Sequence, residues 1–190
     1  AIKPLINLIA QTQLEFLDIR RTEIDGGSLR VFIQKRQSDS DGKLPPKVKR
    51  LLEKEKSAGL DDVKTLKLLA KRVKELRIDL KKTLTDLKAK KKTIAAYGAA
   101  AKGNILLNYC NITHKLIDFA VDSTPYKQGL YMPGTHIRIY PESEIMNRKP
   151  DYILILAWNF AREIMEKERK YTSMGGKFII PVPKVTIIGQ

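Results

Sequence analysis

The spacing of hydrophobic residues changes along the chain. In a small N-terminal segment it changes from the spacing typical of a helix to that typical of strands. Apolar side chains in residues 4–14 recur at helical intervals, whereas residues 16–19 and 29–34 have the features of strands. Residues 21–28 between the two strands carry turn chemistry, including adjacent glycines. The pattern therefore predicts a helix followed by two strands.

A lysine-rich segment follows a polar surface linker at residues 35–43. Pro45 and Pro46 suit the first turn of a helix that ends near Ser57, and a second helix is predicted over residues 62–91. In this second helix, leucine and valine recur every three or four residues, as in a long amphipathic helix. The members of the apolar stripe are Leu66, Leu69, Val73, Leu76, Leu80, Leu84 and Leu87.

From residue 93 onward, short apolar strands alternate with helical segments. The predicted strands are residues 93–97, 116–121, 136–140, 152–157 and 176–180. The predicted helices are residues 103–111, 142–147 and 159–172. Such alternation is typical of an α/β fold with a mostly parallel sheet flanked by helices. The chain is thus predicted to hold three parts, residues 1–42, 43–92 and 93–190.

Ligands of open parallel sheets bind beyond the carboxyl ends of the strands, near the point where the strand order reverses. Several loops of the third part are therefore expected to converge on one edge of the sheet. These loops are residues 98–104, 122–135, 140–143 and 157–160.

The first of these loops joins a buried strand to a helix through small residues. Gly98 and Gly103 permit a tight turn and a close approach of a ligand to the backbone, and Lys102 adds positive charge near the N–H groups that begin the helix. The loop lacks the Lys and Ser or Thr that a Walker loop requires, and it lacks the third glycine of the dinucleotide fingerprint. Two interpretations stay open, a phosphate-binding loop and plain packing of the helix on the strand.

Polar and aromatic residues follow the next predicted strand. Asp122 ends that strand, where an acid that binds ribose sits in dinucleotide-binding domains. In the long loop that follows, Lys127 is a candidate partner for a phosphate, and Tyr126 and Tyr131 are candidates for stacking on a ring. Local packing of the loop is the alternative for each tyrosine.

Other candidates have simple structural alternatives. His136 is a possible acid or base, but it begins a strand without an evident carboxylate partner. Asn159 opens a helix and is predicted to cap it while facing the ligand edge. Glu142 and Glu144 are interpreted as charges at the N-terminus of a helix.

The chain has 190 residues, 43% hydrophobic residues and a net charge of +15, of which residues 43–92 supply +11. The lysines are interpreted as the solvated face of the amphipathic helix, and a surface for anionic partners is the alternative. Few aromatic residues lie near them, which disfavours nucleic-acid binding. The absence of a run of about 20 apolar residues and of a leader predicts a cytoplasmic protein. The single Cys110 excludes an internal disulfide and a multi-cysteine zinc site.

Taken in order, these segments resemble the C-terminal part of the sugar C-methyltransferases. These enzymes use S-adenosylmethionine to methylate a carbon beside the keto group of a nucleotide-linked deoxysugar. The resemblance covers nearly the whole chain. The matching segments are residues 26–30, 97–104, 121–122, 133–137, 150–152, 157–159 and 175–181.

The resemblance implies a Rossmann-like domain that holds the nucleotide-sugar and faces an upstream domain that binds S-adenosylmethionine. It also implies that the zinc element and the catalytic base lie upstream, so no metal is expected in this chain. The residues expected to bind substrate are Gly98, Lys102, Gly103, Asn104, Asp122, Lys127, His136 and Asn159. The chain departs from the family at Asp25, where many members have His, and at Ile105, where many have Thr.

Two other functions stay open at this point. The chain could be a nucleotide-binding module that serves no methyltransferase, recognising its ligand through the loop at residues 98–104. Alternatively, the lysine-rich helix could bind nucleic acid or another anionic scaffold, in which case binding should be strongest at low salt.

Overall fold

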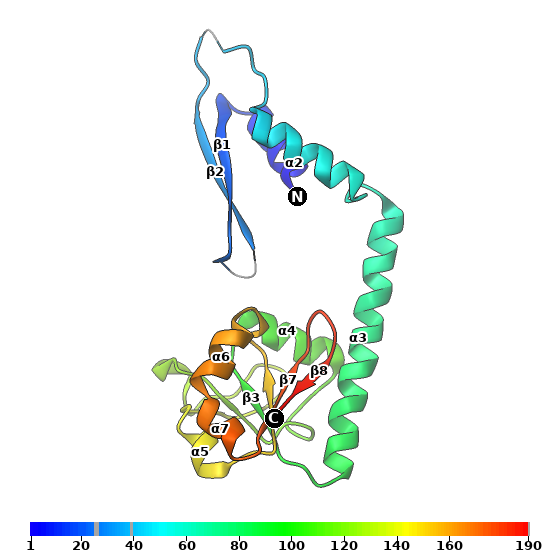
Figure 1. The fold of residues 1–190 in the computed structure, drawn as a ribbon, viewed down its shortest axis with the longest axis vertical. Coiled ribbons are helices and arrows are strands. Elements are labelled where there is room, and N and C mark those ends of the chain that lie inside the picture. Colours follow the sequence, from blue (N-terminus) through cyan, green and yellow to red (C-terminus); the bar gives the residue numbers. More distant parts are fainter. Residues whose placement is uncertain (25–26, 39, 190) are drawn as a thin grey trace. The chain divides into compact units, whose positions relative to one another are not determined.

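Helices and strands form two units, Ala1–Lys71 and Arg72–Gln190, in the computed structural model of the protein, which describes residues 1–24, 27–38 and 40–189 (Figure 1). Asp25 and Gly26, which belong to the predicted turn, lie outside the described residues. The predicted division into three parts, with boundaries after residues 42 and 92, stays a prediction.

The first unit contains the predicted helix and pair of strands. The elements are α1 (Ile2–Ala10), β1 (Leu14–Thr22), β2 (Ser28–Lys35) and α2 (Pro46–Ser57). The two strands pair in antiparallel register, and a small apolar core forms where both helices pack on them. The strands are longer than predicted, and α1 ends four residues earlier than predicted.

The long amphipathic helix is present as α3 (Val63–Ala89). Leu80, Leu84 and Leu87 in its C-terminal part are buried in the core of the second unit. By contrast, Leu66 and Leu69 are each 56% exposed. The predicted apolar stripe therefore contributes to this core only through its C-terminal members. No helix among the described residues has both the length and the apolar character needed to cross a membrane.

The second unit is built on a sheet whose described strands follow the order β5-β4-β3-β6-β7-β8. All neighbouring strands pair in parallel except β7 and β8, which are antiparallel. The strand order reverses between β3 and β6, so the crevice expected to hold a ligand opens there. The strands are β3 (Ile94–Tyr97), β4 (Phe119–Val121), β5 (Ile139–Tyr140), β6 (Tyr152–Ile155), β7 (Lys177–Ile180) and β8 (Thr186–Ile188).

Alternating residues of the parallel strands serve two hydrophobic cores, one on each face of the sheet. In β3, Ile94 and Ala96 belong to the core shared with α3 and α4, whereas Ala95 and Tyr97 belong to the opposite core with α5, α6 and α7. Figure 1 shows α4 and α6 on opposite sides of the strands. The helical elements that follow β3 are α4 (Ala101–Cys110), η2 (Pro125–Lys127), α5 (Glu144–Arg148), η3 (Trp158–Phe160), α6 (Ala161–Lys167) and α7 (Arg169–Ser173).

The α/β fold class is confirmed, and several boundaries differ from the prediction. The strand predicted at residues 116–121 begins at Phe119, because the N–H groups of Leu116 and Ile117 donate to the Thr113 carbonyl and form a turn. The helix predicted at residues 159–172 is divided into η3, α6 and α7. The strand β8 was not predicted.

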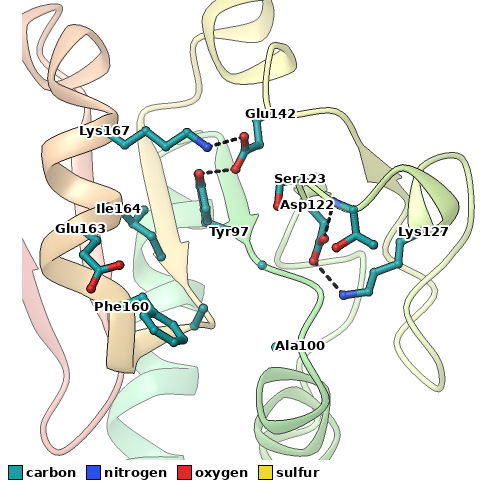
Figure 2. Close-up of a pocket in the computed structure, with 13 residues that line it drawn as sticks. Tyr97, Ala100, Asp122, Ser123, Lys127, Glu142, Phe160, Glu163, Ile164 and Lys167 are labelled. Carbon is teal, nitrogen blue, oxygen red and sulfur yellow. Dashed lines mark hydrogen bonds and ion pairs between the residues drawn. The ribbon is translucent and has the colours of Figure 1, made fainter. Parts of the chain in front are cut away.

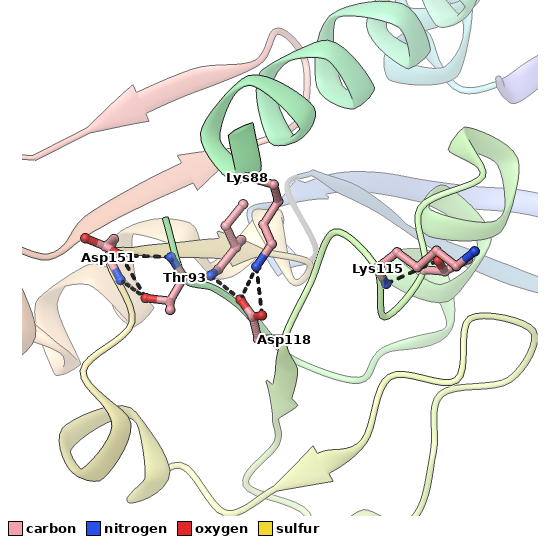
Figure 3. Close-up of polar contacts among 7 residues, drawn as sticks. Lys88, Thr93, Lys115, Asp118 and Asp151 are labelled. Carbon is pink, nitrogen blue, oxygen red and sulfur yellow. Dashed lines mark hydrogen bonds and ion pairs between the residues drawn. The ribbon is translucent and has the colours of Figure 1, made fainter. Parts of the chain in front are cut away.

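Two aspartates form hydrogen bonds that connect the amino ends of the central strands (Figure 3). The carboxylate of Asp118, just before β4, accepts hydrogen bonds from Lys88 Nζ and from the Ile94 N–H, each at 2.8 Å. The carboxylate of Asp151, just before β6, accepts hydrogen bonds from Lys92 Nζ and from the N–H and hydroxyl of Thr93. These contacts tie the end of α3 and the start of β3 to the neighbouring strands.

Asp151→Asn is expected to destabilise the protein by about 1 kcal/mol at pH 7, after allowance for partial exposure. The hydrogen bond from Lys92, together with those from Thr93, lowers the pKa of Asp151 from 3.8 to about 2. Because the folded-state pKa is depressed, this stabilisation is complete above about pH 4 and is lost as the pH falls toward 2. Urea unfolding of the two proteins across this range measures the difference.

The control is Asp86→Asn, an exposed position on α3, which should leave stability unchanged. A stability difference between wild type and Asp151→Asn that is the same at pH 2 and pH 7 would contradict the role given to this carboxylate.

Candidate functional site

The four loops predicted to converge do so around a cavity of about 350 Å³ at the carboxyl ends of β3, β4 and β6. Each loop contributes to its wall, through Gly98, Asp122, Glu142 and Ala157 respectively. Figure 2 shows the side chains of this cavity, which is called the acidic cavity below because its lining contains three carboxylates. The predicted convergence of the four loops is thus confirmed, and the cavity lies where the strand order reverses.

Asp122 is held in the acidic cavity by several hydrogen bonds. Its side chain is 9% exposed, and it accepts hydrogen bonds from the N–H groups of Ala99 (2.7 Å) and Thr124 (2.9 Å). Burial acts to raise the pKa of Asp122, but these hydrogen bonds and that of Lys127 outweigh burial and hold it below the ordinary value. The carboxylate is therefore ionised and fixed in place.

Lys127 completes this arrangement from η2. Its Nζ lies 3.2 Å from Asp122 Oδ2 and also 3.2 Å from the Ala99 carbonyl oxygen, to which it donates. The loop after β4 is thereby tied to the loop after β3. Because the lysine is only partly buried, its ammonium remains available to a ligand while Asp122 limits where it can move.

A second polar cluster in the acidic cavity was missed by the sequence analysis. The hydroxyl of Tyr97 donates to the carboxylate of Glu142, and Lys167 Nζ lies 2.5 Å from the other oxygen of the same carboxylate. Burial, followed by the hydrogen bond to Glu142, raises the pKa of Tyr97 well above its ordinary value. Glu142 is therefore not simply a helix charge, because it joins β3 to α6.

Glu168 lies beside this cluster, and its Oε1 is 3.4 Å from the Tyr97 hydroxyl. Burial, and then repulsion from Glu142, raise the pKa of Glu168. The sequence offered one weak signal of the cluster, since Tyr97 ends the apolar strand directly before Gly98. Its partners come from later elements and share no local spacing with it.

The two glycines of the first loop have different structural roles. Gly98 has φ +90°, a conformation that L side chains rarely adopt, and it is part of the acidic cavity. A Cβ at Gly103 would lie 2.6 Å from Leu156 Cβ, so this glycine lets α4 pack closely on the chain that follows β6. The packing interpretation thus explains Gly103 without a ligand. No described side chain caps α4, so the N–H groups of its first turn are not satisfied by a cap.

The remaining predicted residues are dispersed. Lys102 Nζ lies 5.5 Å from the Trp158 ring centroid and 5.4 Å from the Phe160 ring centroid, as a cation–π partner of both. His136 is exposed, has φ 56° and does not line the acidic cavity. Asn159 lies inside η3, and the residues at the N-caps of η3 and α6 are Ala157 and Phe160, so the predicted capping by Asn159 was wrong.

Asn104 faces a second cavity of about 390 Å³ on the other side of the first loop. The wall of this second cavity, called the apolar cavity below, is formed by Ala99–Ala101, Asn104, Lys127, Ile139 and the segment Leu130–Pro133. Lys127 is the only charged residue in this described lining, and it lines both cavities. The part of the chain that the structure describes contains no group of His, Cys, Asp and Glu that could hold a metal ion.

Comparison with known proteins gives two findings. A family model described as the C-methyltransferase C-terminal domain matches residues 23–183. The C-methyltransferase NovU of Streptomyces niveus is 34% identical over 184 residues, which cover 97% of this chain and 43% of NovU. The chain therefore spans less than half the length of this relative.

The pairing of Asp122 with Lys127 can be measured by a double-mutant cycle. Asp122→Asn is expected to lower the free energy of unfolding by about 1–3 kcal/mol, because two N–H groups and an ammonium lose a charged acceptor. Lys127→Met should cost less in the Asp122→Asn background than in the wild type, giving a coupling of about 0.5–2 kcal/mol. Chemical denaturation at pH 7 gives all four values.

The matched control is the exposed ion pair of Asp41 and Lys43, where the same two substitutions should show no measurable coupling. Strict additivity at Asp122 and Lys127 would show that the two side chains act independently.

Proposed function

This chain belongs to the C-methyltransferase C-terminal domain family, and we propose that it is the substrate-side domain of an S-adenosylmethionine-dependent enzyme. The proposed substrate is a nucleotide-linked deoxysugar that is methylated on a carbon beside its keto group. One observation carries this proposal. Lys127 lines a cavity at the point where the strand order reverses, and it contacts both the loop after β3 and the start of the loop after β4. Ligands of such sheets that carry a phosphate bind at these loops.

The state of the carboxylates supports a binding role for this chain. Asp122 is ionised and already accepts three hydrogen bonds, and Glu142 is engaged by Tyr97 and Lys167. A general base must be free to accept a proton from the substrate in the reacting complex. These groups are better suited to orienting hydroxyls than to abstracting a proton, so the proposal assigns the base to another part of the enzyme.

The proposed reaction explains why a separate binding domain is useful. A base removes the proton beside the ketone, donors stabilise the enolate oxygen, and the carbanion attacks the methyl group of the sulfonium. The rate of such a step depends on holding two substrates in line. Contacts with the nucleotide end, far from the reacting carbon, supply binding energy that orients the sugar.

Asp122 is not free to hold the ribose of S-adenosylmethionine. Asp122 occupies the strand end where an acid binds ribose in dinucleotide-binding domains, but it is already paired with Lys127 at 3.2 Å. The proposal therefore assigns the cofactor to another domain and the nucleotide-sugar to this one.

Thymidine diphosphate is a probe that separates these assignments. Titration of the 190-residue chain is expected to shift the amide signals of Gly98, Ala99 and Lys127, and Lys127→Met should weaken binding about tenfold through loss of a charged contact. S-adenosylmethionine should produce no comparable shifts. Nuclear magnetic resonance titration and calorimetry give the site and the affinity.

Lys115→Met, which removes a lysine that lines neither cavity, is the matched control and should leave the affinity unchanged. The assignment fails if thymidine diphosphate leaves these amides unmoved. It also fails if the isolated chain binds S-adenosylmethionine tightly and methylates a keto-sugar.

A further inference from the structure

Two cavities flank the loop after β3, and their linings differ in charge. The acidic cavity is lined by the carboxylates of Asp122, Glu142 and Glu163 and by two lysines. The apolar cavity is lined mainly by alanine, leucine, methionine and isoleucine side chains, together with Tyr131. Ala100 and Lys127 line both, so the cavities adjoin at the start of α4.

Tyr131 is an exposed aromatic ring at the apolar cavity. It is 57% exposed, and the guanidinium of Arg138 lies 6.0 Å from its ring centroid. The same guanidinium lies 5.3 Å from the ring centroid of Tyr140, and the guanidinium of Arg148 lies 4.1 Å from that centroid. Alternating rings and guanidinium groups thus link Tyr131 to β5 and α5 through cation–π contacts.

The backbone that carries Tyr131 is also fixed. Tyr131 forms an antiparallel bridge with Arg138, and the Met132 N–H donates to the Ile137 carbonyl at 2.8 Å. The turn within this hairpin is held to α4 because Asn108 Nδ2 donates to the Pro133 carbonyl at 3.1 Å. A ring on such a rigid support loses little conformational entropy when a ligand stacks on it.

The geometry points to the apolar cavity as the site of the nucleobase, stacked on Tyr131, with the diphosphate at Lys127 and the sugar in the acidic cavity. This inference rests on the proposed function and adds the direction in which the nucleotide-sugar lies. The volume of about 390 Å³ falls within the range of about 300–1,000 Å³ that is usual for small-molecule sites.

The charges of the two linings support this direction over its reverse. Carboxylates accept hydrogen bonds from sugar hydroxyls, but they repel phosphate oxygens. A diphosphate is therefore best placed at Lys127, where the cavities meet and where the uncapped N–H groups of α4 begin. The neutral ring of a base is then best placed in the apolar cavity. There, the side chain of Asn104 offers an amide donor and acceptor for the polar edge of the base.

The experiment compares two tyrosines of one loop in the 190-residue chain. Tyr131→Ala is expected to weaken thymidine diphosphate binding about tenfold or more, because a stacked base contributes substantially to affinity. Tyr131→Phe should bind nearly as well as the wild type, since it keeps the ring. The matched control is Tyr126→Ala, because Tyr126 is 79% exposed but does not line the apolar cavity.

Two further probes test the direction. Inorganic pyrophosphate, which has no base, should bind wild type and Tyr131→Ala equally. Nuclear Overhauser effects from the thymine methyl group should reach Met132 and Ile139 of the apolar cavity, and not Ile164 of the acidic cavity. Thermal unfolding confirms that each variant is folded.

The outcomes separate the two proposals. Binding of thymidine diphosphate that is unaffected by Tyr131→Ala, with thymine contacts to Ile164, would overturn the inferred direction and leave the proposed function standing. Absence of thymidine diphosphate binding to the wild type would overturn both. Equal weakening by Tyr126→Ala and Tyr131→Ala would also overturn the inference, because the loop as a whole and not the stacked ring would then be responsible.

Discussion

The close approach of α4 to the chain that follows β6 is the constraint on which the candidate site depends. Gly103 leaves no room for a Cβ beside Leu156, and Gly98 adopts φ +90° where a Cβ would lie 3.1 Å from that of Ala157. These contacts fix where α4 begins, at the reversal of strand order. The Ala99 N–H then lies within reach of Asp122, and through Asp122 the position of Lys127 is set as well.

Local patterns were sufficient to predict the sheet and the loops that meet at its edge. Alternating apolar residues and turn residues depend on near neighbours, and the carboxyl ends of parallel strands share one edge whatever their order. The strand β8 was not predicted because it is short and lacks a buried face, with Ile187 and Ile188 45% and 39% exposed. It forms through its pairing with β7, which local patterns do not reveal. The apolar stripe of α3 did not predict which of its members would be buried.

The loop residues of the candidate site were predicted to come together. The cluster whose members are distant in the sequence was missed. Gly98, Asp122 and Lys127 follow strands whose ends must converge, and they line one cavity. Glu142 was misinterpreted because its partners, Tyr97 and Lys167, belong to other elements. No local spacing connects these three positions. The capping role predicted for Asn159 was wrong because η3, a short helical turn, precedes α6 and shifts the cap.

The net charge and the local charges act at different ranges in the proposed complex. The chain carries +15, most of it in residues 43–92, and such an excess attracts anions at low ionic strength. At physiological salt this attraction is screened beyond about 8 Å, so it cannot choose the orientation of a bound nucleotide-sugar. Orientation has to come from neighbours in direct contact. In the acidic cavity these neighbours include Glu142 and Glu163, besides Asp122, which is already paired with Lys127. Excess positive charge can therefore aid encounter, while Glu142 and Glu163 favour placing the diphosphate at Lys127.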